Sequence, residues 1–173
     1  MAEYNDNLWA PWRMEYIRSL GDDLTDQGCF LCEYWSDPDH DRENHVVRRS
    51  ASTLAVLNRF PYTNGHVLIA HAGHKGDITD LSEEELMEIT LMTRSIVQVL
   101  RTLLNPGGFN IGYNIGKCAG AGLPGHLHAH VVPRWTGDTS FMAVVGDVRV
   151  VPDSLEAMCT KITRALKGLE EPT

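Results

Sequence analysis

The chain has 173 residues, a formal net charge of −8 at pH 7 and 43% hydrophobic residues, which suits one globular domain with its own core. The acidic balance argues against a broad nucleic-acid surface, which needs a basic face, but it allows a nucleotide in a local pocket. No apolar run approaches the roughly 18–20 residues needed to span a bilayer, so we expect no membrane-spanning segment.

The N-terminal residues differ in character from the rest. Met1–Asp6 lacks the basic and apolar regions of a secretory signal. Leu8–Ile17 is rich in aromatic residues and is interrupted by Pro11. We expect residues 1–25 to form an arm that packs on the domain or on a partner subunit, or that helps to wall a nucleotide site. Residues 26–173 are then the catalytic domain.

Three short strands are predicted next, at residues 45–49, 53–58 and 66–70. The residues 61–65 between the second and third include Pro61, Asn64 and Gly65, which are typical of a hairpin-like connection.

A long helix follows. Ser82 and Glu85 have the spacing of a capping box, and acidic residues fill the first turn, where the helix dipole favours them. The helix pattern ends at Asn105–Gly108, which contains Pro106 and Gly107. Apolar residues recur at helical spacing between these limits: Leu86, Ile89, Met92, Ile96, Leu100 and Leu103.

Two further strands and a helix complete the pattern. Residues 109–115 alternate apolar and polar, which indicates a half-buried strand whose polar face could meet a ligand. The next strand is predicted at 127–133, and Asp153–Glu156 caps a helix that ends near Gly168. Strands, one long helix and two more strands indicate an α+β fold with an antiparallel sheet.

The most informative motif lies in the fifth strand. His126, His128 and His130 occupy alternate positions, so their rings are expected on one face of an extended chain. A surface histidine cluster, or strand histidines satisfied by hydrogen bonds, is the alternative. We favour a functional site, because strands rarely place three polar rings at consecutive same-face positions.

This motif resembles the signature of the histidine triad (HIT) family of nucleotide hydrolases and transferases. The segments 58–69, 109–116 and 119–122 resemble the nucleoside-binding strand and turn and the stretch that leads into the triad. Pro133–Met142 is similar to the bacterial branch near diadenosine tetraphosphate phosphorylases and dinucleoside polyphosphate hydrolases. The resemblance implies a HIT-like sheet of about five strands with one long and one C-terminal helix, often continued across a homodimer.

The resemblance also implies roles for the three histidines. His128 is expected to attack the α-phosphate of a nucleotide, because a neutral imidazole is a good nucleophile and leaves easily afterwards. His130 is expected to donate to the phosphate, and His126 belongs to the same catalytic group. This step needs no metal, since imidazole and backbone N–H groups can hold the developing charge.

Residues around the triad are candidates for nucleotide binding. Glycines at 116–125 let backbone N–H groups approach phosphates, so Gly120, Ala121 and Gly122 are expected there. Many family members have Gly-Gln-Ser/Thr where this chain reads Ala121-Gly-Leu-Pro124. Asn114 is expected to contact phosphate or ribose.

Asn58 stands where many relatives carry an acidic residue for the ribose hydroxyls, and an amide can still bind them. The alternative for Asn58 is a turn-starting residue. Arg134, Thr139 and Ser140 are further candidates, for the second substrate.

Cys29-x-x-Cys32 indicates half of a zinc site, or else chance or redox chemistry. Zinc prefers four ligands in a tetrahedron, and resemblance to zinc-bearing family members supplies His74 and His126 for a structural site. Two buried thiols are the alternative. His40, His45 and His71 are expected to be solvated, with His71 as a fallback ligand.

The four cysteines are too few for a disulfide framework at this length, so we expect a cytoplasmic protein with reduced thiols. The resemblance implies an enzyme that cleaves a purine dinucleoside polyphosphate, with water or phosphate as acceptor. A nucleoside phosphoramidate hydrolase, a non-catalytic purine-nucleotide-binding module and a catalytic metal centre are the alternatives.

Overall fold

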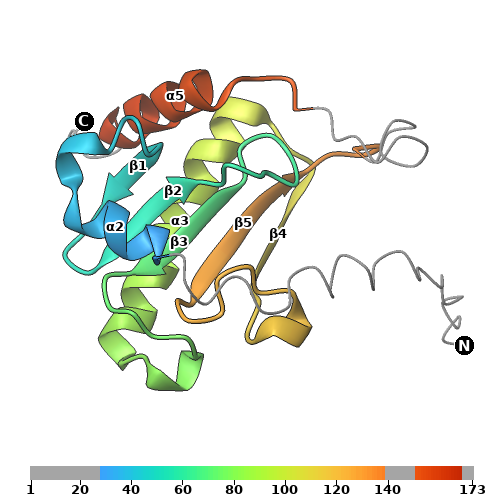
Figure 1. Cartoon of the computed structure of the whole chain (residues 1–173). Coiled ribbons are helices and arrows are strands. Elements are labelled where there is room, and N and C mark those ends of the chain that lie inside the picture. The colour runs from blue at the N-terminus through green and yellow to red at the C-terminus, as the bar shows by residue number, and fades with distance from the viewer. Residues whose placement is uncertain (1–27, 139–150, 169–173) are drawn as a thin grey trace, which may run out of the picture.

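The computed structural model describes residues 28–138 and 151–168, and the arm predicted at residues 1–25, Thr139 and Ser140 lie outside them. Its centre is a five-stranded antiparallel sheet with the order β1-β2-β3-β5-β4 (Figure 1). The predicted α+β class is confirmed. The strands are β1 (Val46–Arg49), β2 (Thr53–Leu57), β3 (Val67–His71), β4 (Gly108–Tyr113) and β5 (His128–Arg134).

Helix α3 (Glu83–Leu104) covers one face of the sheet and has the predicted ends. The Ser82 hydroxyl accepts from the Glu85 N–H, and the Glu85 carboxylate accepts from the Ser82 N–H. This capping box satisfies two backbone donors that a helix N-terminus otherwise leaves unpaired. Asn105 ends the helix in the left-handed conformation, with φ 44°.

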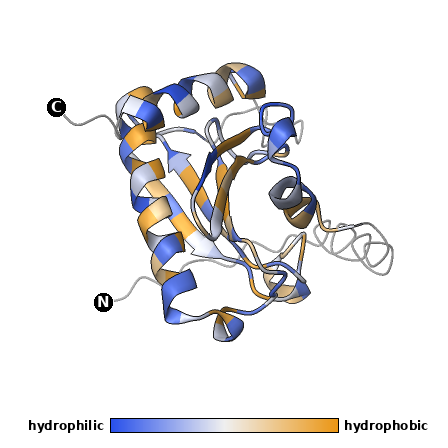
Figure 2. Ribbon diagram, turned by 90° about the vertical axis from the view of Figure 1, so that its left-hand side faces the viewer, coloured by the Kyte–Doolittle hydropathy of each residue, from blue (hydrophilic) through white to orange (hydrophobic). Residues whose placement is uncertain are grey.

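Helix α5 (Leu155–Gly168) packs on the same face as α3. Its cap is Ser154, whose hydroxyl accepts from the Ala157 N–H at 3.2 Å. Both helices show apolar and polar stripes, and their apolar residues meet alternate residues of the strands (Figure 2). The fully buried centre of this core includes Ile69, Ile89, Ile96, Leu100, Val131 and Ile162.

The opposite face carries a short helix that the sequence analysis missed, α2 (Phe30–Ser36). Its Leu31 and Tyr34 pack on Leu54, Val56 and Leu68, which are the strand residues that alternate with the larger core. The two faces of the sheet are therefore covered by different elements.

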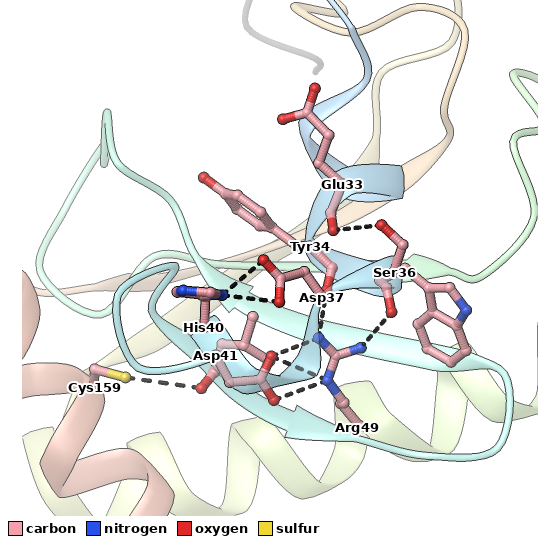
Figure 3. A network of polar contacts seen from close by, with 10 residues as sticks. Glu33, Tyr34, Ser36, Asp37, His40, Asp41, Arg49 and Cys159 are labelled. Carbon is pink, nitrogen blue, oxygen red and sulfur yellow. Dashed lines mark hydrogen bonds and ion pairs between the residues drawn. The ribbon is translucent and has the colours of Figure 1, made fainter.

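Arg49 fixes the C-terminal end of α2 to the sheet (Figure 3). Its guanidinium donates to the backbone carbonyls of Tyr34 and Trp35 and to both carboxylate oxygens of Asp41. Carbonyls at a helix C-terminus have no partner within the helix. Arg49 therefore replaces the missing hydrogen bonds and stabilises a helix of only seven residues.

The remaining described elements are three single turns of 3-10 helix: η2 (Pro38–His40), η3 (Ile78–Asp80) and η4 (Lys117–Ala119). In the part of the chain that the structure describes, no helix has the length and apolar character needed to cross a bilayer.

Candidate nucleotide and metal site

The three triad histidines lie on the face that bears α2. The residues that alternate with them, Leu127 and Ala129, belong to the core beneath α3 and α5. His128 and His130 are in β5, and His126 precedes its first residue. The three rings therefore share one face as predicted, although His126 lies before the first residue of the strand.

His128 is held by the backbone of the first triad histidine. Its Nδ1 lies 2.8 Å from the carbonyl oxygen of His126, and a carbonyl can only accept. The Nδ1 must then carry the proton, which leaves a lone pair on Nε2. Burial lowers the pKa of His128 below its ordinary value, so this neutral form prevails at pH 7.

A relay of hydrogen bonds sets the tautomer of His130. The Nδ1 of His66 accepts from the backbone N–H of Tyr62 at 3.1 Å, so the proton of His66 is on Nε2. That Nε2–H donates to Nδ1 of His130 at 3.0 Å. His130 is thereby left with its proton on Nε2. The amide nitrogen of Asn114, 3.4 Å away, is also a donor, so in this tautomer the two N–H groups lie side by side and do not bond to each other.

His66 is a site residue to which the sequence analysis gave no role. It is fully buried, and it lies 64 positions from the ring that it orients. A histidine directly after the turn at Asn64-Gly65 was the available signal.

Burial also determines the charge of the site. Desolvation, reinforced by the neighbouring His128, lowers the pKa of His130 to about 4. His130 is therefore neutral at pH 7 and acts as an N–H donor rather than as a cation.

The predicted phosphate loop offers fewer donors than expected. The N–H groups of Gly120 and Ala121 donate within the loop, to the carbonyls of Lys117 and Gly116. Gly122 is exposed, and its N–H has no backbone partner among the described residues. The internal hydrogen bonds of η4 explain why Gly120 and Ala121 have no free N–H group for a phosphate.

The two asparagine candidates differ in what they can offer. Asn58 accepts from the Phe60 N–H through its side-chain oxygen, and its amide nitrogen lies 3.3 Å from His66 Nδ1. This arrangement matches the turn-starting alternative. Asn114 lies directly beside His130.

An open cavity of about 800 Å³ extends from His130 along β4 and β5. Tyr62 lines its start, with the ring stacked on that of His130 at 6.0 Å between centroids. Arg134 and Trp135 line its far end, where Arg134 is held by Asp138 and Asn110. The polar side chain of Asn110 and the open surface at Gly112 face this cavity, as predicted for the polar face of β4.

The four predicted metal ligands come together beside the triad. One ligand atom from each of Cys29, Cys32, His74 and His126 lies within 4.8 Å of all the others. Nδ1 of His126 is 3.1 Å from the sulfur of Cys29, and Nδ1 of His74 is 3.3 Å from that of Cys32. Tetrahedral zinc with ordinary bond lengths requires a sulfur–nitrogen separation of roughly 3.6 Å. The group fits a zinc ion after shifts of a few tenths of an ångström.

The surroundings of this cluster also suit a metal. Nε2–H of His126 donates to the carbonyl oxygen of His71 at 2.9 Å, which leaves Nδ1 free to bind. Burial and the neighbouring Cys29 raise the pKa of Cys32 to about 11, so without a cation its thiol stays protonated. A divalent cation would reverse that preference.

The expectation that His45 and His71 are solvated is wrong. His71 is 1% exposed and neither ring nitrogen has a hydrogen-bond partner among the described residues, while His45 is 9% exposed. The His71 ring lies 5.2 Å from that of His126, outside the four-ligand group. His71 is the last residue of β3, and its neighbours include Glu85 of α3 and the ring of His126.

Comparisons with known proteins decide the family. The HIT domain family model matches residues 40–137, which is more than half of the chain. The chain belongs to the HIT family. The resemblance inferred from the triad motif is thereby confirmed.

Among curated HIT relatives, an AP-4-A phosphorylase from Mycobacterium tuberculosis is 35% identical over 151 residues, covering 86% of this chain and 77% of the relative. The asymmetrical bis(5'-nucleosyl)-tetraphosphatase of Schizosaccharomyces pombe is 31% identical over 97 residues, covering 56% and 53%. Both are named as enzymes, and the prediction of a HIT-family enzyme is confirmed at this level.

Among solved HIT structures, a zinc-bound histidine triad family protein from Mycobacterium smegmatis matches with a TM-score of 0.67 and 30% identity. The match covers 83% of this chain and 96% of the other. The HIT-like fold predicted from the sequence is confirmed.

Proposed function

We propose that this enzyme cleaves a dinucleoside polyphosphate at the α-phosphate through a covalent nucleotidyl-His128. The observation that carries the proposal is the hydrogen bond from Nδ1 of His128 to the His126 carbonyl. It fixes the neutral tautomer whose Nε2 lone pair can attack phosphorus. The names of the two curated relatives support this class of substrate.

The first step forms a bond between His128 Nε2 and the α-phosphorus and breaks the bond to the bridging oxygen. The remaining nucleoside polyphosphate leaves with the electron pair of that bond. Nε2–H of His130 donates to an oxygen of the phosphate, and Asn114 assists from the same side. His66 acts as a positioning residue, since it determines which nitrogen of His130 carries the proton.

Water or inorganic phosphate then attacks the same phosphorus, which breaks the phosphorus–nitrogen bond and restores neutral His128. The acceptor determines the product: water gives a nucleoside monophosphate, and phosphate gives a nucleoside diphosphate. The cavity of about 800 Å³ supports a two-ended substrate, because it continues from His130 to Arg134 and Trp135.

We also propose that Cys29, Cys32, His74 and His126 hold a structural zinc ion. Four protein ligands complete a tetrahedron and leave no position for substrate, which is the pattern of structural zinc. When bound, the ion would fix the ring of His126, the residue whose carbonyl orients His128. The zinc-bound structural relative supports this choice of metal.

A homodimer is part of the proposal. Strand β4 is an edge of the sheet, and Ile111 on it is 50% exposed. Unpaired edge strands with exposed apolar side chains favour pairing with another chain. The catalytic domain proposed for 26–173 and the cytoplasmic location predicted from the cysteines are part of the same proposal.

The experiment that tests the function is incubation with diadenosine tetraphosphate, with and without inorganic phosphate. Products are separated by anion-exchange chromatography. ADP and ATP formed only with phosphate identify a phosphorylase, whereas AMP and ATP formed without phosphate identify a hydrolase. No turnover in either condition contradicts the proposal and directs the search to phosphoramidates or to binding without catalysis.

A further inference from the structure

A second cavity, of about 640 Å³, lies at the opposite edge of the sheet from β4. It is an open cavity bordered by β1, by the turn that contains Arg42 and by the C-terminal half of α5. Its floor includes the buried Val47 and Cys159. Strands β2 and β3 separate this edge from β5, so the cavity is distinct from the triad site.

Cations from three elements meet in this cavity. Arg42 comes from the turn, Arg48 from β1, and Arg164 and Lys167 from α5. A chain with a net charge of −8 has therefore gathered four positive side chains at one place. The C-terminus of a helix favours basic residues by its dipole, which could account for Arg164 and Lys167 alone. It does not account for Arg42 and Arg48.

The one carboxylate among the described lining residues is engaged elsewhere. Asp41, the carboxylate in the cavity lining, accepts from Arg49 through both oxygens, at 3.1 and 2.8 Å (Figure 3). Within residues 28–138 and 151–168, no carboxylate forms an ion pair with Arg42, Arg164 or Lys167.

Other charged groups on α5 behave differently. Lys161 lies outside the cavity and pairs with Asp153 at 2.5 Å, and Glu156 lies 3.7 Å from His45. Lys161 thus has a carboxylate partner, whereas Arg164 and Lys167 have none among residues 28–138 and 151–168.

The arrangement on the helix is elongated. Thr160, Arg164 and Lys167 recur at steps of four and three, so they share one face. Seven residues of helix span about 10 Å. Thr163 adds a second hydroxyl to the lining. Guanidinium groups bind phosphate oxygens with two parallel hydrogen bonds. The Thr160 hydroxyl adds no donor, because it donates to the Glu156 carbonyl at 2.9 Å.

We propose that this cavity is a second anion site that binds an oligophosphate chain, away from the triad histidines. Cations from the turn and from two successive turns of α5, Arg42, Arg164 and Lys167, suit several linked phosphates better than a single one. The oligophosphate can be free or can be part of a nucleotide, because both present the same anion. This inference does not depend on the proposed catalytic function.

The test is a titration of the ¹⁵N-labelled full-length protein, followed by amide chemical shifts, with tripolyphosphate, ATP or adenosine added separately. Tripolyphosphate and ATP should shift amides at 41–48 and 159–167, and adenosine should not. The apparent affinity should fall as salt rises, because exposed charges are screened.

Arg164→Gln with Lys167→Gln should weaken tripolyphosphate binding at these amides at least tenfold. Lys161→Gln removes the same kind of charge from the same helix outside the cavity, and it should leave the affinity unchanged. If the double variant does not fold, Arg42→Gln tests the cavity from another element.

Three results would overturn the proposal. One is the absence of shifts at these amides at about 10 mM tripolyphosphate, a concentration on the order of ten thousand times that needed for micromolar binding. Another is an equal loss of affinity in Lys161→Gln and in the double variant. The third is a response to ATP without one to tripolyphosphate, since recognition would then lie in the nucleoside.

Discussion

The two faces of the sheet use the same strands for different purposes. Towards α3 and α5, β5 contributes Ala129 and Val131 to a dry core. Towards α2, the alternate residues His128 and His130 contribute the candidate chemistry, next to the four possible metal ligands. Period-two alternation lets one strand do both. Substitutions on one face should therefore change stability and those on the other should change activity.

The largest expected effect is on the α2 face. His128→Asn should lower kcat/KM for diadenosine tetraphosphate by about 10⁴-fold or more, because the amide cannot form the covalent intermediate. The thermal midpoint should change little, since the variant keeps a polar side chain near the His126 carbonyl. Steady-state kinetics and calorimetry on the same preparation measure both. Residual activity within tenfold of the unmodified enzyme would exclude His128 as nucleophile.

On the opposite face, Ile96→Ala should lower the free energy of unfolding by about 2–5 kcal/mol, because it removes buried methyl groups and leaves a cavity. Ile96 is fully buried under the sheet. Urea denaturation measures this change. The kcat of the folded variant should stay within a few fold of the original, and a far greater loss would show that the two faces are not separable.

Cys32→Ser distinguishes the possible metal cluster from the triad histidines, which lie on the same face of the sheet. It should abolish most of the bound zinc, measured by elemental analysis, and lower the thermal midpoint by several degrees, because one tetrahedral ligand is lost. Cys118→Ser is the matched control, since Cys118 is exposed and outside the cluster. Equal zinc content in the two variants would contradict the site.

His66→Phe should lower kcat by about 10- to 100-fold, because it removes the hydrogen bond that places the proton of His130 on Nε2. His66→Gln retains a donor and should recover part of the loss. The ¹⁵N shifts of the His130 ring report its tautomer directly. An unchanged tautomer in His66→Phe would show that His66 is only a packing residue.

The smallest expected effect is that of pH between 6 and 8. Burial lowers the pKa of His130 to about 4, so that ring stays neutral over this range, and it lowers the pKa of His128 below its ordinary value, so that ring is less protonated at pH 6 than a free imidazole. The rate should be flat there and fall at more acidic pH. Stability should fall in the same direction, because the unfolded histidines bind protons with a pKa near 6.5 and the folded ones do not. A loss of rate on the acid side with its midpoint at pH 6.5 or above would contradict the lowered pKa values of the two buried rings.

The sequence predicted the elements that local chemistry determines. The capping box at Ser82 and Glu85 is complete within four residues, and the α3 boundary followed from it. Helix α2 was missed because its seven residues depend on Arg49, which is distant in the sequence. The burial of His71 likewise involves distant residues such as His126, which no local pattern shows.

The same distinction holds at the site. The order of the triad residues was visible in five consecutive letters, and the four possible metal ligands were predicted from Cys29-x-x-Cys32 together with the family resemblance. The relay from Tyr62 through His66 to His130 joins residues far apart in the chain. The donors of Gly120 and Ala121 were overestimated because composition does not reveal that η4 uses them internally.

The central claim is that the α2 face of β5 carries the nucleophile, and trapping the intermediate tests it most directly. Diadenosine tetraphosphate is mixed with the enzyme and quenched in base, which preserves a phosphorus–nitrogen bond, and peptides are analysed by mass spectrometry. We predict one adenylyl group on His128, and none in His128→Asn. Turnover without adenylylated enzyme, or the adduct on another residue, would contradict the account.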